Sequence, residues 1–477
     1  MISQIYNTSL SLLTDLYQLT MAYGYFKSGI AGRSAVFNLF YRRQPFKGNF
    51  AVACGLEYVI DYIRGLKFTQ SDLEYISTLK GADSKPLFDE DFLHYLSGFS
   101  PTCNLDAIPE GTVVFPHEPL IRVEASLLEA QLLETPLLNI VNFQTLIATK
   151  AARVCRAAYP DGVLEFGLRR AQGIDGGLSA SRAAFAGGCV ATSNVLAGKL
   201  FGIPVRGTHA HSWVMCFDTE LEAFETYAKA LPNNCIFLVD TYDTLEGVRN
   251  AVKVGKVLRK NGHEMLGIRL DSGDLAELSI GARKILDENG FQKAVITASN
   301  DLDEYRIEEL KSKGSRITLW GVGTNLVTAQ DQPALGGVYK LGAIQDEGGN
   351  WEYRIKLSEE AVKTSNPGFL QVRRYYHPEF NMPLADMLYD ELSYDGKGTI
   401  INTFSGESLQ LPSETVYQDL LQPIFRNGLL VYKLPSLNQI QEISIEQVSK
   451  FAPLIQPYPT GLESGLFKIK EQLMAGF

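Results

Sequence analysis

Residues 294–324 read AVITASNDLDEYRIEELKSKGSRITLWGVGT and indicate the fold class of this chain. A short run of β-branched and aliphatic residues comes first, a helical segment follows, and a second apolar run ends in glycines. This pattern is typical of two parallel strands joined by a crossover helix. Asp301 precedes the helical segment and Glu304 follows three residues later, which predicts a capping box, while Gly314 predicts the C-terminal end of the helix.

The same unit recurs on both sides of this stretch. The apolar runs that predict strands are Val163–Gly167, Ile203–Gly207, Cys235–Asp240, Met265–Asp271, Ala294–Ser299, Ile317–Gly323 and Gly337–Ala343. Their spacing suits a strand followed by a crossover helix. We therefore expect an α/β protein in which residues 160–345 form an irregular (β/α) barrel of about seven units.

Two further regions flank the predicted barrel, as expected for a chain of 477 residues, which exceeds what one core usually serves. Residues 1–120 mix predicted helices at 13–26 and 55–64 with extended segments at 34–41 and 112–123, which indicates an N-terminal α+β domain. Helices within residues 125–160 and C-terminal segments are expected to complete it. Residues 346–477 predict a smaller C-terminal region, with a hairpin in LSYDGKGTIINTFSG, residues 392–406.

Composition excludes several classes of function. The formal net charge of −10 argues against a nucleic-acid-binding surface. No apolar run approaches the roughly 20 residues that a membrane-spanning helix needs, so no membrane partner is expected. The six cysteines form no C-x-x-C pair, and the N-terminus has no signal-peptide pattern, which together predict reduced thiols and a cytoplasmic location.

Polar and charged side chains gather where the predicted strands end, the face on which enzymes of this architecture carry their sites. They are Glu165, Phe166, Arg169, Arg170, Thr208, His209, His211, Asp240, Arg269, Asp271, Asp274, Ser299, Asn300, Gly321, Gly323 and Thr324. Each residue alone has an ordinary structural explanation, such as a helix cap, a tight turn or solvated surface. Their coincidence predicts an enzyme that binds an anionic, phosphorylated substrate.

Two motifs indicate how that anion is held. GVGTN follows an apolar run, so its glycines and the N-terminus of the next helix could bind a phosphate. Arg169 and Arg170, which follow EFGL and are adjacent to each other, could bind a phosphate bidentately. In IRLDSGD, Arg269 and Asp271 lie two residues apart on a strand and therefore face the same way.

Other motifs leave alternatives open. His209 and His211 could be a metal pair of the amidohydrolase kind, although later strand ends supply no further histidine. FLVDTYDT, residues 237–244, faintly resembles the diphosphate loop of flavodoxin-like phosphoribosyltransferases but lacks its adjacent acids and its TGGT-like ending. No Walker A loop is present, so any use of ATP requires a different site.

Several motifs in order resemble the nicotinate phosphoribosyltransferase family. They are LLTDLYQLTMAYGY (12–25), EFGLRRAQGIDGGLSASRAAFAGGCVATSN (165–194), GIPVRGTHAHSWVM (202–215), GIRLDSGDL (267–275), ASNDLDEYRI (298–307) and GVGTNLVT (321–328). KLSEEAVKTSNPGFLQVRR also resembles the family, but Phe369 stands where a basic residue is expected. The resemblance implies that nicotinate and phosphoribosyl diphosphate form nicotinate mononucleotide and pyrophosphate, with ATP as cosubstrate and Mg²⁺. This is the entry step of NAD synthesis from nicotinate.

The resemblance also implies roles for individual residues. His211 would be phosphorylated by ATP, and Asp271 would hold the ribose hydroxyls. Thr208 and Arg269 would contact nicotinate, whose ring would lie between Phe166 and Tyr17. Tyr17 would come from a neighbouring subunit, which implies a homodimer with shared active sites. The phosphate-binding group would comprise Arg169, Gly323, Thr324 and Ser299, while magnesium ligands remain unassigned.

Three alternatives compete with this assignment. Nicotinamide phosphoribosyltransferase carries an aspartate where this sequence has Ser193, and an aspartate would repel a carboxylate substrate, so serine favours nicotinate. Quinolinate phosphoribosyltransferase has a shorter chain and a more basic site. A non-catalytic nucleotide-binding paralogue is disfavoured because His211, Arg269 and Asp271 are all present.

Overall fold

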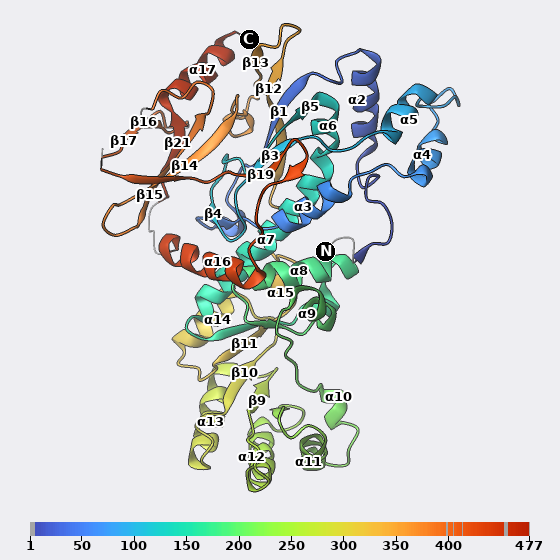
Figure 1. Ribbon diagram of the computed structural model, residues 1–477. Coiled ribbons are helices and arrows are strands. Elements are labelled where there is room, and N and C mark those ends of the chain that lie inside the picture. Colours follow the sequence, from blue (N-terminus) through green and yellow to red (C-terminus); the bar gives the residue numbers. More distant parts are fainter. Residues whose placement is uncertain (1–4, 397–398, 404, 413, 453–456, 477) are drawn as a thin grey trace. The chain divides into compact units, whose positions relative to one another are not determined.

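The computed structural model describes residues 5–396, 399–403, 405–412, 414–452 and 457–476. The chain divides into two compact units, of which the first combines residues 1–146 with 334–477 and the second comprises residues 147–333. Helix α7 (Glu134–Ala158) runs from the first unit into the second (Figure 1). Among the described residues, no helix is both long and apolar enough to cross a membrane.

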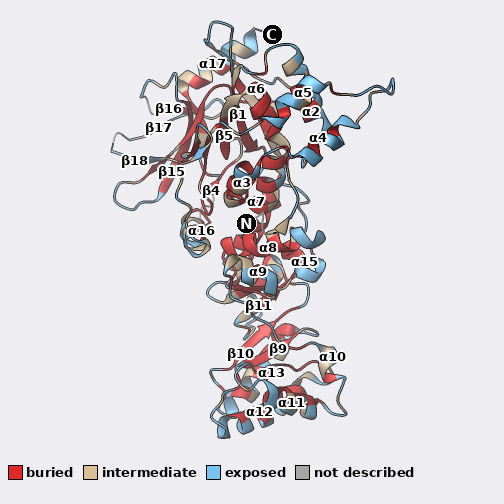
Figure 2. Cartoon of the chain, turned by 45° about the vertical axis from the view of Figure 1, so that its right-hand side comes forward, coloured by how far each residue is buried: buried red, intermediate tan, exposed pale blue. Residues whose placement is uncertain are grey.

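The second unit is built on a parallel six-stranded sheet in the order β7-β6-β11-β10-β9-β8. The strands are β6 (Gly162–Glu165), β7 (Ala191–Thr192), β8 (Ile236–Leu238), β9 (Gly267–Leu270), β10 (Val295–Ala298) and β11 (Leu319–Val322). Figure 2 shows β9 and β10 as a buried layer, with α11, α12 and α13 presenting exposed outer faces. The parallel β/α arrangement predicted from residues 294–324 is confirmed.

Helices connect these strands. They are η2 (Leu168–Arg170), α8 (Gly173–Ala186), α9 (Val195–Phe201), α10 (His211–Val214), α11 (Glu220–Ala230), α12 (Thr244–Lys260), α13 (Leu275–Glu288), α14 (Glu304–Ser312) and α15 (Thr324–Val327). Side chains of Asp243, Asp274 and Asp303 accept backbone N–H bonds at the starts of α12, α13 and α14. Asp274, which stands among the strand-end residues of the sequence, is therefore a helix cap.

Three local expectations for this unit were wrong. Gly337–Ala343 is no seventh barrel strand, because β12 (Gly337–Gln345) pairs antiparallel with β1 (Ser34–Tyr41) in the first unit. The run 203–207 forms only an isolated parallel bridge, Thr192 to Val205, and no ladder between described residues joins β8 to β7. Asp303 rather than Asp301 caps α14, since two residues of the predicted helix remain in the preceding turn; Gly314 does follow its end, with φ of +76°.

The first unit contains two large sheets and a two-stranded one. The seven-stranded sheet has the order β13-β12-β1-β5-β3-β19-β20, the six-stranded sheet β17-β16-β21-β15-β14-β18, and β2 pairs with β4. The remaining strands are β2 (Ala51–Val52), β3 (Asn104–Ala107), β4 (Val113–Val114), β5 (Ile121–Ser126), β13 (Trp351–Tyr353), β14 (Leu370–Tyr376), β15 (Pro383–Asp390), β16 (Thr399–Ile401), β17 (Ser408–Gln410), β18 (Val416–Asp419), β19 (Gln422–Arg426), β20 (Leu429–Leu430) and β21 (Thr460–Glu463).

The helices of the first unit are α2 (Leu16–Lys27), η1 (Pro45–Lys47), α3 (Leu56–Gly65), α4 (Gln70–Ser77), α5 (Glu90–Ser97), α6 (Leu127–Leu132), η3 (Ala361–Lys363), α16 (Leu437–Phe451) and α17 (Ser464–Ala475). The predicted helices at 13–26 and 55–64 correspond to α2 and α3. The predicted hairpin is present as β16 and β17, paired from Thr399 with Gln410, later in the chain than 392–406 suggested. Residues 397–398 and 404 of that prediction lie outside the described residues.

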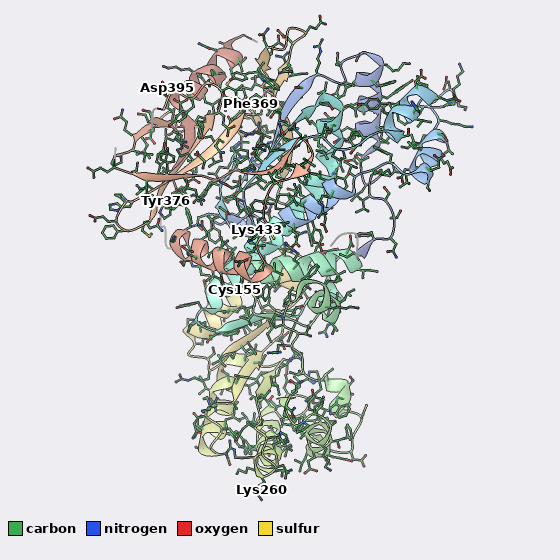
Figure 3. All side chains as sticks on the ribbon, viewed as in Figure 1. Cys155, Lys260, Phe369, Tyr376, Asp395 and Lys433 are labelled. Atoms are coloured by element: carbon green, nitrogen blue, oxygen red, sulfur yellow. The ribbon has the colours of Figure 1, made fainter. Side chains whose placement is uncertain are left out.

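Phe369 takes a structural place in the first unit, where the family resemblance led us to expect a basic side chain. It is 7% exposed and packs with Val36 and Ala343. Phe369 is labelled in Figure 3. Its ring meets that of Trp351 edge-on, with centroids 4.7 Å apart. An apolar contact therefore occupies the position of the expected cation.

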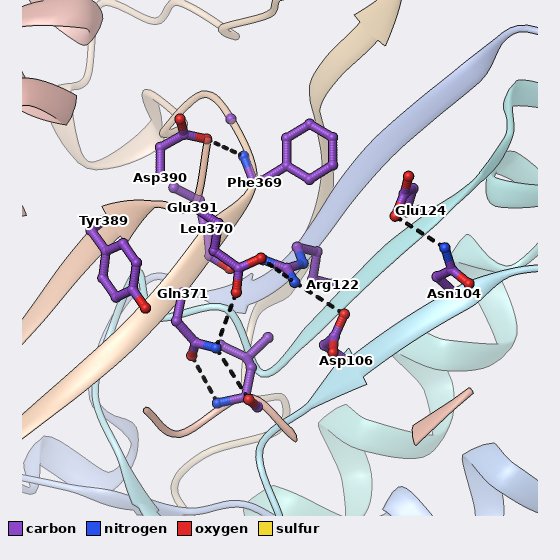
Figure 4. Close-up of polar contacts among 12 residues, drawn as sticks. Asn104, Asp106, Arg122, Glu124, Phe369, Leu370, Gln371, Tyr389, Asp390 and Glu391 are labelled. Carbon is purple, nitrogen blue, oxygen red and sulfur yellow. Dashed lines mark hydrogen bonds and ion pairs between the residues drawn. The ribbon is translucent and has the colours of Figure 1, made fainter. Parts of the chain in front are cut away.

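Arg122 connects the C-terminal strands to the N-terminal ones within this unit. Its guanidinium forms ion pairs with Asp106 at 3.0 Å and Glu391 at 2.8 Å, and it donates to the carbonyl of Leu370 at 3.1 Å (Figure 4). Because Arg122 is buried, loss of either carboxylate would leave a poorly compensated charge. Residues 369–391 are thus built into the same unit as β3 and β5.

Candidate active site

A cavity of about 500 Å³ opens at the carboxyl ends of the parallel strands in the second unit. It is lined by Phe166, Leu168, Arg169, Arg170, Ser193, Gly207, Thr208, His209, Ala210, Arg269, Asp271, Ser299, Asn300, Asp301, Gly321, Gly323 and Thr324. Five different strand ends and the 207–210 loop contribute, which is the placement expected when parallel strands end at one edge. Among the residues to which the family resemblance assigns a role, His211 and Tyr17 are absent from this lining, and of the other strand-end residues Glu165, Asp240 and Asp274 are absent too.

Arg269 is the hub of the cavity. Its Nε donates to Ser299 Oγ at 2.9 Å, Nη1 to Thr208 Oγ1 at 3.2 Å, and Nη2 to Asp271 Oδ1 at 3.3 Å. Ser299 also donates a short hydrogen bond to Asp271 Oδ1. The guanidinium is held on three sides, so its plane and position are fixed before any ligand arrives.

Phe166 forms an aromatic wall beside this hub, with its ring centroid 5.9 Å from the Arg269 guanidinium carbon. The glycines of GVG make room for it, because a Cβ at Gly321 would lie 2.8 Å from Phe166 Cδ2 and one at Gly323 would lie 3.1 Å from the Phe166 carbonyl. These glycines therefore have a packing reason as well as the predicted phosphate role. The helix that follows, α15, has only four residues, so its dipole adds little.

The two histidines of the HAH motif lie in different surroundings. His209 is buried against Phe224, Tyr227 and Phe237, and its Nε2 accepts the backbone N–H of Leu238 at 3.3 Å. Burial lowers the pKa of His209 to about 4, so its imidazole is neutral at pH 7. With Nε2 already occupied, His209 is held as a packing residue rather than as half of a metal pair.

His211, at the start of α10, faces acids. Its Nε2 lies 3.7 Å from Asp271 Oδ2 and 4.0 Å from Asp240 Oδ1, and its Nδ1 lies 3.1 Å from Thr241 Oγ1. The ring is about two-fifths exposed, at 39%. Thr241 therefore orients the imidazole and leaves Nε2 open toward the carboxylates.

Asp240 sits behind this histidine at the end of β8. Its Oδ2 accepts from the backbone N–H of Asp271 and from Ser272 Oγ, both at 2.7 Å. Its Oδ1 is buried and has no hydrogen-bond partner among the described residues. A buried carboxylate oxygen that accepts no hydrogen bond is costly, so it is suited to a ligand cation or donor.

Glu165 fixes the neighbouring strand ends. It is fully buried, and its carboxylate accepts from Ser181 Oγ at 2.8 Å, from Thr192 Oγ1 at 2.5 Å and, in a short bond, from Gly167 N–H. The acid thus joins β6, α8 and β7 beneath Ser193. Its role is to hold the cavity wall, which the strand-end pattern alone could not distinguish from contact with substrate.

The turn after β10 is strained. Asn300 and Asp301 have φ of +101° and +43°, and the buried Asn325 amide donates to the carbonyls of Asp301 and Leu302 at 2.9 and 3.2 Å. Strained backbone of this kind persists where the surroundings determine it and often lies at binding sites. Sequence reasoning missed Asn325 and Thr241, because tertiary packing and not a spacing in the sequence sets the direction of each side chain.

The fold and this cavity define an α/β enzyme whose site lies at the carboxyl ends of a parallel sheet. The model of the "Nicotinate phosphoribosyltransferase (NAPRTase) family" matches residues 163–354, and models of the corresponding N-terminal and C-terminal domains match residues 12–142 and 370–466. The chain belongs to the nicotinate phosphoribosyltransferase family.

Individual relatives agree. The chain is 46% identical to nicotinate phosphoribosyltransferase of Bacillus subtilis, over 97% of this chain and 95% of the relative. It is 35% identical to the Homo sapiens enzyme of that name, over 93% and 91% of the two chains. The crystal structure of human nicotinic acid phosphoribosyltransferase superposes with a TM-score of 0.82 at 31% identity, covering 96% of this chain and 99% of that one.

Proposed function

We propose that the cavity around Arg269 transfers the phosphoribosyl group of phosphoribosyl diphosphate to nicotinate, giving nicotinate mononucleotide and pyrophosphate. This is the nicotinate phosphoribosyltransferase activity of NAD salvage, carried out in the cytoplasm. The observation that carries it is the fixed Arg269 guanidinium, hydrogen-bonded to Thr208, Ser299 and Asp271 inside a strand-end cavity rimmed by Arg169 and Arg170.

Arg269 supplies the recognition of the nicotinate carboxylate. Each of its terminal nitrogens has a second N–H beyond those given to Thr208 and Asp271, and a carboxylate can accept that pair bidentately. Phe166 offers a face on which the pyridine ring can stack. Ser193, at the cavity wall, adds no negative charge, which supports nicotinate over substrates that need an acidic partner.

The remaining wall suits the phosphoribosyl donor. During transfer the bond from ribose C1 to the diphosphate oxygen breaks while the pyridine nitrogen bonds to C1, so positive charge develops on the ribose. Asp271 would hold the ribose hydroxyls and stabilise that charge, while Arg169, Gly323 and Thr324 would bind phosphate oxygens. Ser299 was expected among the phosphate ligands; because its hydroxyl donates to Asp271, we assign it to positioning that acid.

His211 would accept the γ-phosphoryl group of ATP at Nε2, with the N–P bond forming as the bond to the ADP oxygen breaks. The contact between Nδ1 and Thr241 leaves Nε2 available for this attack. Asp240 and Asp271 are the residues that would hold Mg²⁺, since Oδ1 of Asp240 lacks a partner among described residues and Mg²⁺ commonly takes one or two carboxylates plus phosphate oxygens. The ion would supply charge neutralisation for the diphosphate.

Tyr17 would complete the nicotinate site from a second subunit of a homodimer. It lies on α2 in the first unit and is 48% exposed, so its ring is available to another chain. Mixing Tyr17→Ala with His211→Ala chains under subunit exchange should restore activity to about a quarter of wild type, because one site in a mixed dimer regains both residues. No recovery above the separate variants would show that Tyr17 acts in its own chain or not at all.

The activity is tested with purified protein, phosphoribosyl diphosphate, Mg²⁺ and ATP, offering nicotinate or nicotinamide in separate reactions. We expect nicotinate mononucleotide to form with nicotinate and much slower turnover with nicotinamide. Turnover of nicotinamide that equals or exceeds that of nicotinate would overturn the substrate assignment. Turnover of neither would favour a non-catalytic nucleotide-binding role.

A further inference from the structure

A second cavity, of about 280 Å³, lies entirely within the first unit, where one face of α17 meets the segment around residues 358–366. Phe467, Lys470 and Met474 line it from α17, and His117 and Thr403 contribute from elsewhere in this unit. The size is near the lower end of ligand pockets, which span about 300–1,000 Å³. None of the residues assigned above to phosphoribosyl transfer lines it.

Lys470 is the unusual member of this lining. Its side chain is largely buried, with 9% of the residue exposed, and its Nζ donates one hydrogen bond, to Asn366 Oδ1 at 2.9 Å. It forms no ion pair with a carboxylate of the described residues. Burial lowers the pKa of the Lys470 amine to about 8, with Glu471 opposing the shift, so the group is still mostly protonated at pH 7. A buried cation with only a neutral partner is costly.

The groups near Lys470 are hydrogen-bond donors. Thr364 is 5% exposed, and its hydroxyl makes no hydrogen bond to any residue that the structure describes. The Nδ2 amide of Asn366 is likewise without an acceptor in the described part of the chain. Lys470 itself has two further N–H groups. The cavity wall therefore carries several hydrogen-bond donors, which suit a negatively charged acceptor.

The charges at the opening limit what can enter. Glu359 and Glu471 are exposed at the rim, and His117 is kept neutral because burial, with Lys470 and Arg42 nearby, lowers its pKa to about 4. Among the described lining residues, Lys470 is therefore the one positive charge, and Glu359 and Glu471 stand in front of it. Such an arrangement disfavours polyphosphates and nucleic acid but admits a small anion whose body can rest on Phe467 and Met474.

We propose that this cavity is a second ligand site, separate from the reaction site, which binds a small metabolite through one oxyanion group, a carboxylate or a phosphate, held by Lys470, Asn366 and Thr364. The bound anion would supply the counter-charge that Lys470 lacks. The site belongs to the first unit alone and does not depend on phosphoribosyl transfer for its existence.

The test uses the full-length protein with nicotinate mononucleotide and pyrophosphate at saturating concentrations to fill the reaction site. Monofluorophosphate and trifluoroacetate are then titrated separately and followed by fluorine NMR, which distinguishes a phosphate from a carboxylate preference. We expect one saturable site per chain for at least one probe. Lys470→Met should weaken its binding at least about tenfold, as loss of a charge-assisted hydrogen bond does, and Thr364→Val should weaken it severalfold.

Lys468→Met provides the matched control, because Lys468 lies two residues away on the same helix but is exposed. It should bind the probe as wild type does, and the Michaelis constant for phosphoribosyl diphosphate should be unchanged in Lys470→Met. The proposal is overturned if no saturable site remains beside the filled reaction site, if the two lysine variants bind equally, or if phosphoribosyl diphosphate competes for the site. The binding measurements require no turnover, so they would still test this proposal if the transferase assay failed.

Discussion

In the cavity of the second unit, Arg269 lies 3.3 Å from Asp271 and His211 lies near two acids. In the cavity beside α17, by contrast, the neutral Oδ1 of Asn366 is the one hydrogen-bond partner of Lys470 Nζ among the described residues. In the first arrangement the Arg269 cation already has a carboxylate partner before any ligand binds, so its position can be fixed in advance. The second leaves a buried cation unbalanced. A preorganised reaction site and a site that its ligand completes can thus be distinguished by the source of the counter-charge, which is the protein in the first case and the ligand in the second.

Removal of His211 is expected to cause the largest loss of activity of any substitution in the cavity of the second unit. His211→Ala should reduce nicotinate-dependent ATP hydrolysis at least about a thousandfold, as expected when the nucleophile of a covalent step is lost. Phosphate release and loss of phosphohistidine from the isolated protein would be measured. Thr241→Val, which removes the partner of Nδ1 but keeps the nucleophile, should cost only about tenfold. Undiminished ATP hydrolysis in His211→Ala would rule out the phosphohistidine role.

His209 belongs to the same HAH motif as His211 but is buried and carries no charge at pH 7. Its folded pKa of about 4 lies below the ordinary 6.5, so the unfolded chain binds the proton more tightly and stability falls as pH drops below about 6.5. Between pH 7 and pH 5 this amounts to about 2 kcal/mol. The difference in unfolding free energy between wild type and His209→Gln should shrink by that amount over this range. A pH-independent difference would contradict a buried, neutral His209.

Arg269→Lys tests whether the shape of the cation matters as well as its charge. A lysine keeps the positive charge beside Asp271 but loses the planar fork, so the Michaelis constant for nicotinate should rise about tenfold or more, with a smaller change for phosphoribosyl diphosphate. Steady-state kinetics with each substrate varied in turn measure both. Equal losses for the two substrates would place Arg269 away from the nicotinate carboxylate.

The two cavities also differ in how far a sequence can reveal them. The cavity around Arg269 could be predicted because parallel strands bring their carboxyl ends to one edge, so the alternation of strands and helices was enough to group Phe166, Arg269 and Ser299. The same alternation wrongly predicted Gly337–Ala343 as a barrel strand, because an apolar run alone does not show which sheet a strand will join. Asp274 and Asp303 cap helices. The spacing of acids in the sequence does not predict which of them will do so, because capping depends on the local backbone geometry.

The cavity beside α17 had no such signal. His117, Thr364, Thr403 and Lys470 come from four separate stretches, and each alone is an ordinary residue. Only tertiary packing brings them together and buries the lysine. The orienting role of Thr241 was hidden for a related reason, because a hydroxyl beside a histidine ring is a matter of side-chain direction rather than of sequence pattern.

The smallest expected effect concerns the stability of the unbalanced cavity. The folded pKa of Lys470, about 8, lies below the ordinary 10.5, so between these values the unfolded chain holds more protons and stability rises with pH. From pH 7 to pH 9, wild type should gain about 1 kcal/mol of unfolding free energy relative to Lys470→Met. Chemical denaturation at both pH values measures this gain. Wild type should show no such gain relative to Lys468→Met.

Adding the anion should remove this pH dependence. A bound oxyanion favours the protonated amine and raises the pKa of Lys470 toward its ordinary value, so the gain between pH 7 and pH 9 should shrink when the effective fluorinated probe is saturating. A gain that persists unchanged with the probe bound would show that the anion does not contact Lys470.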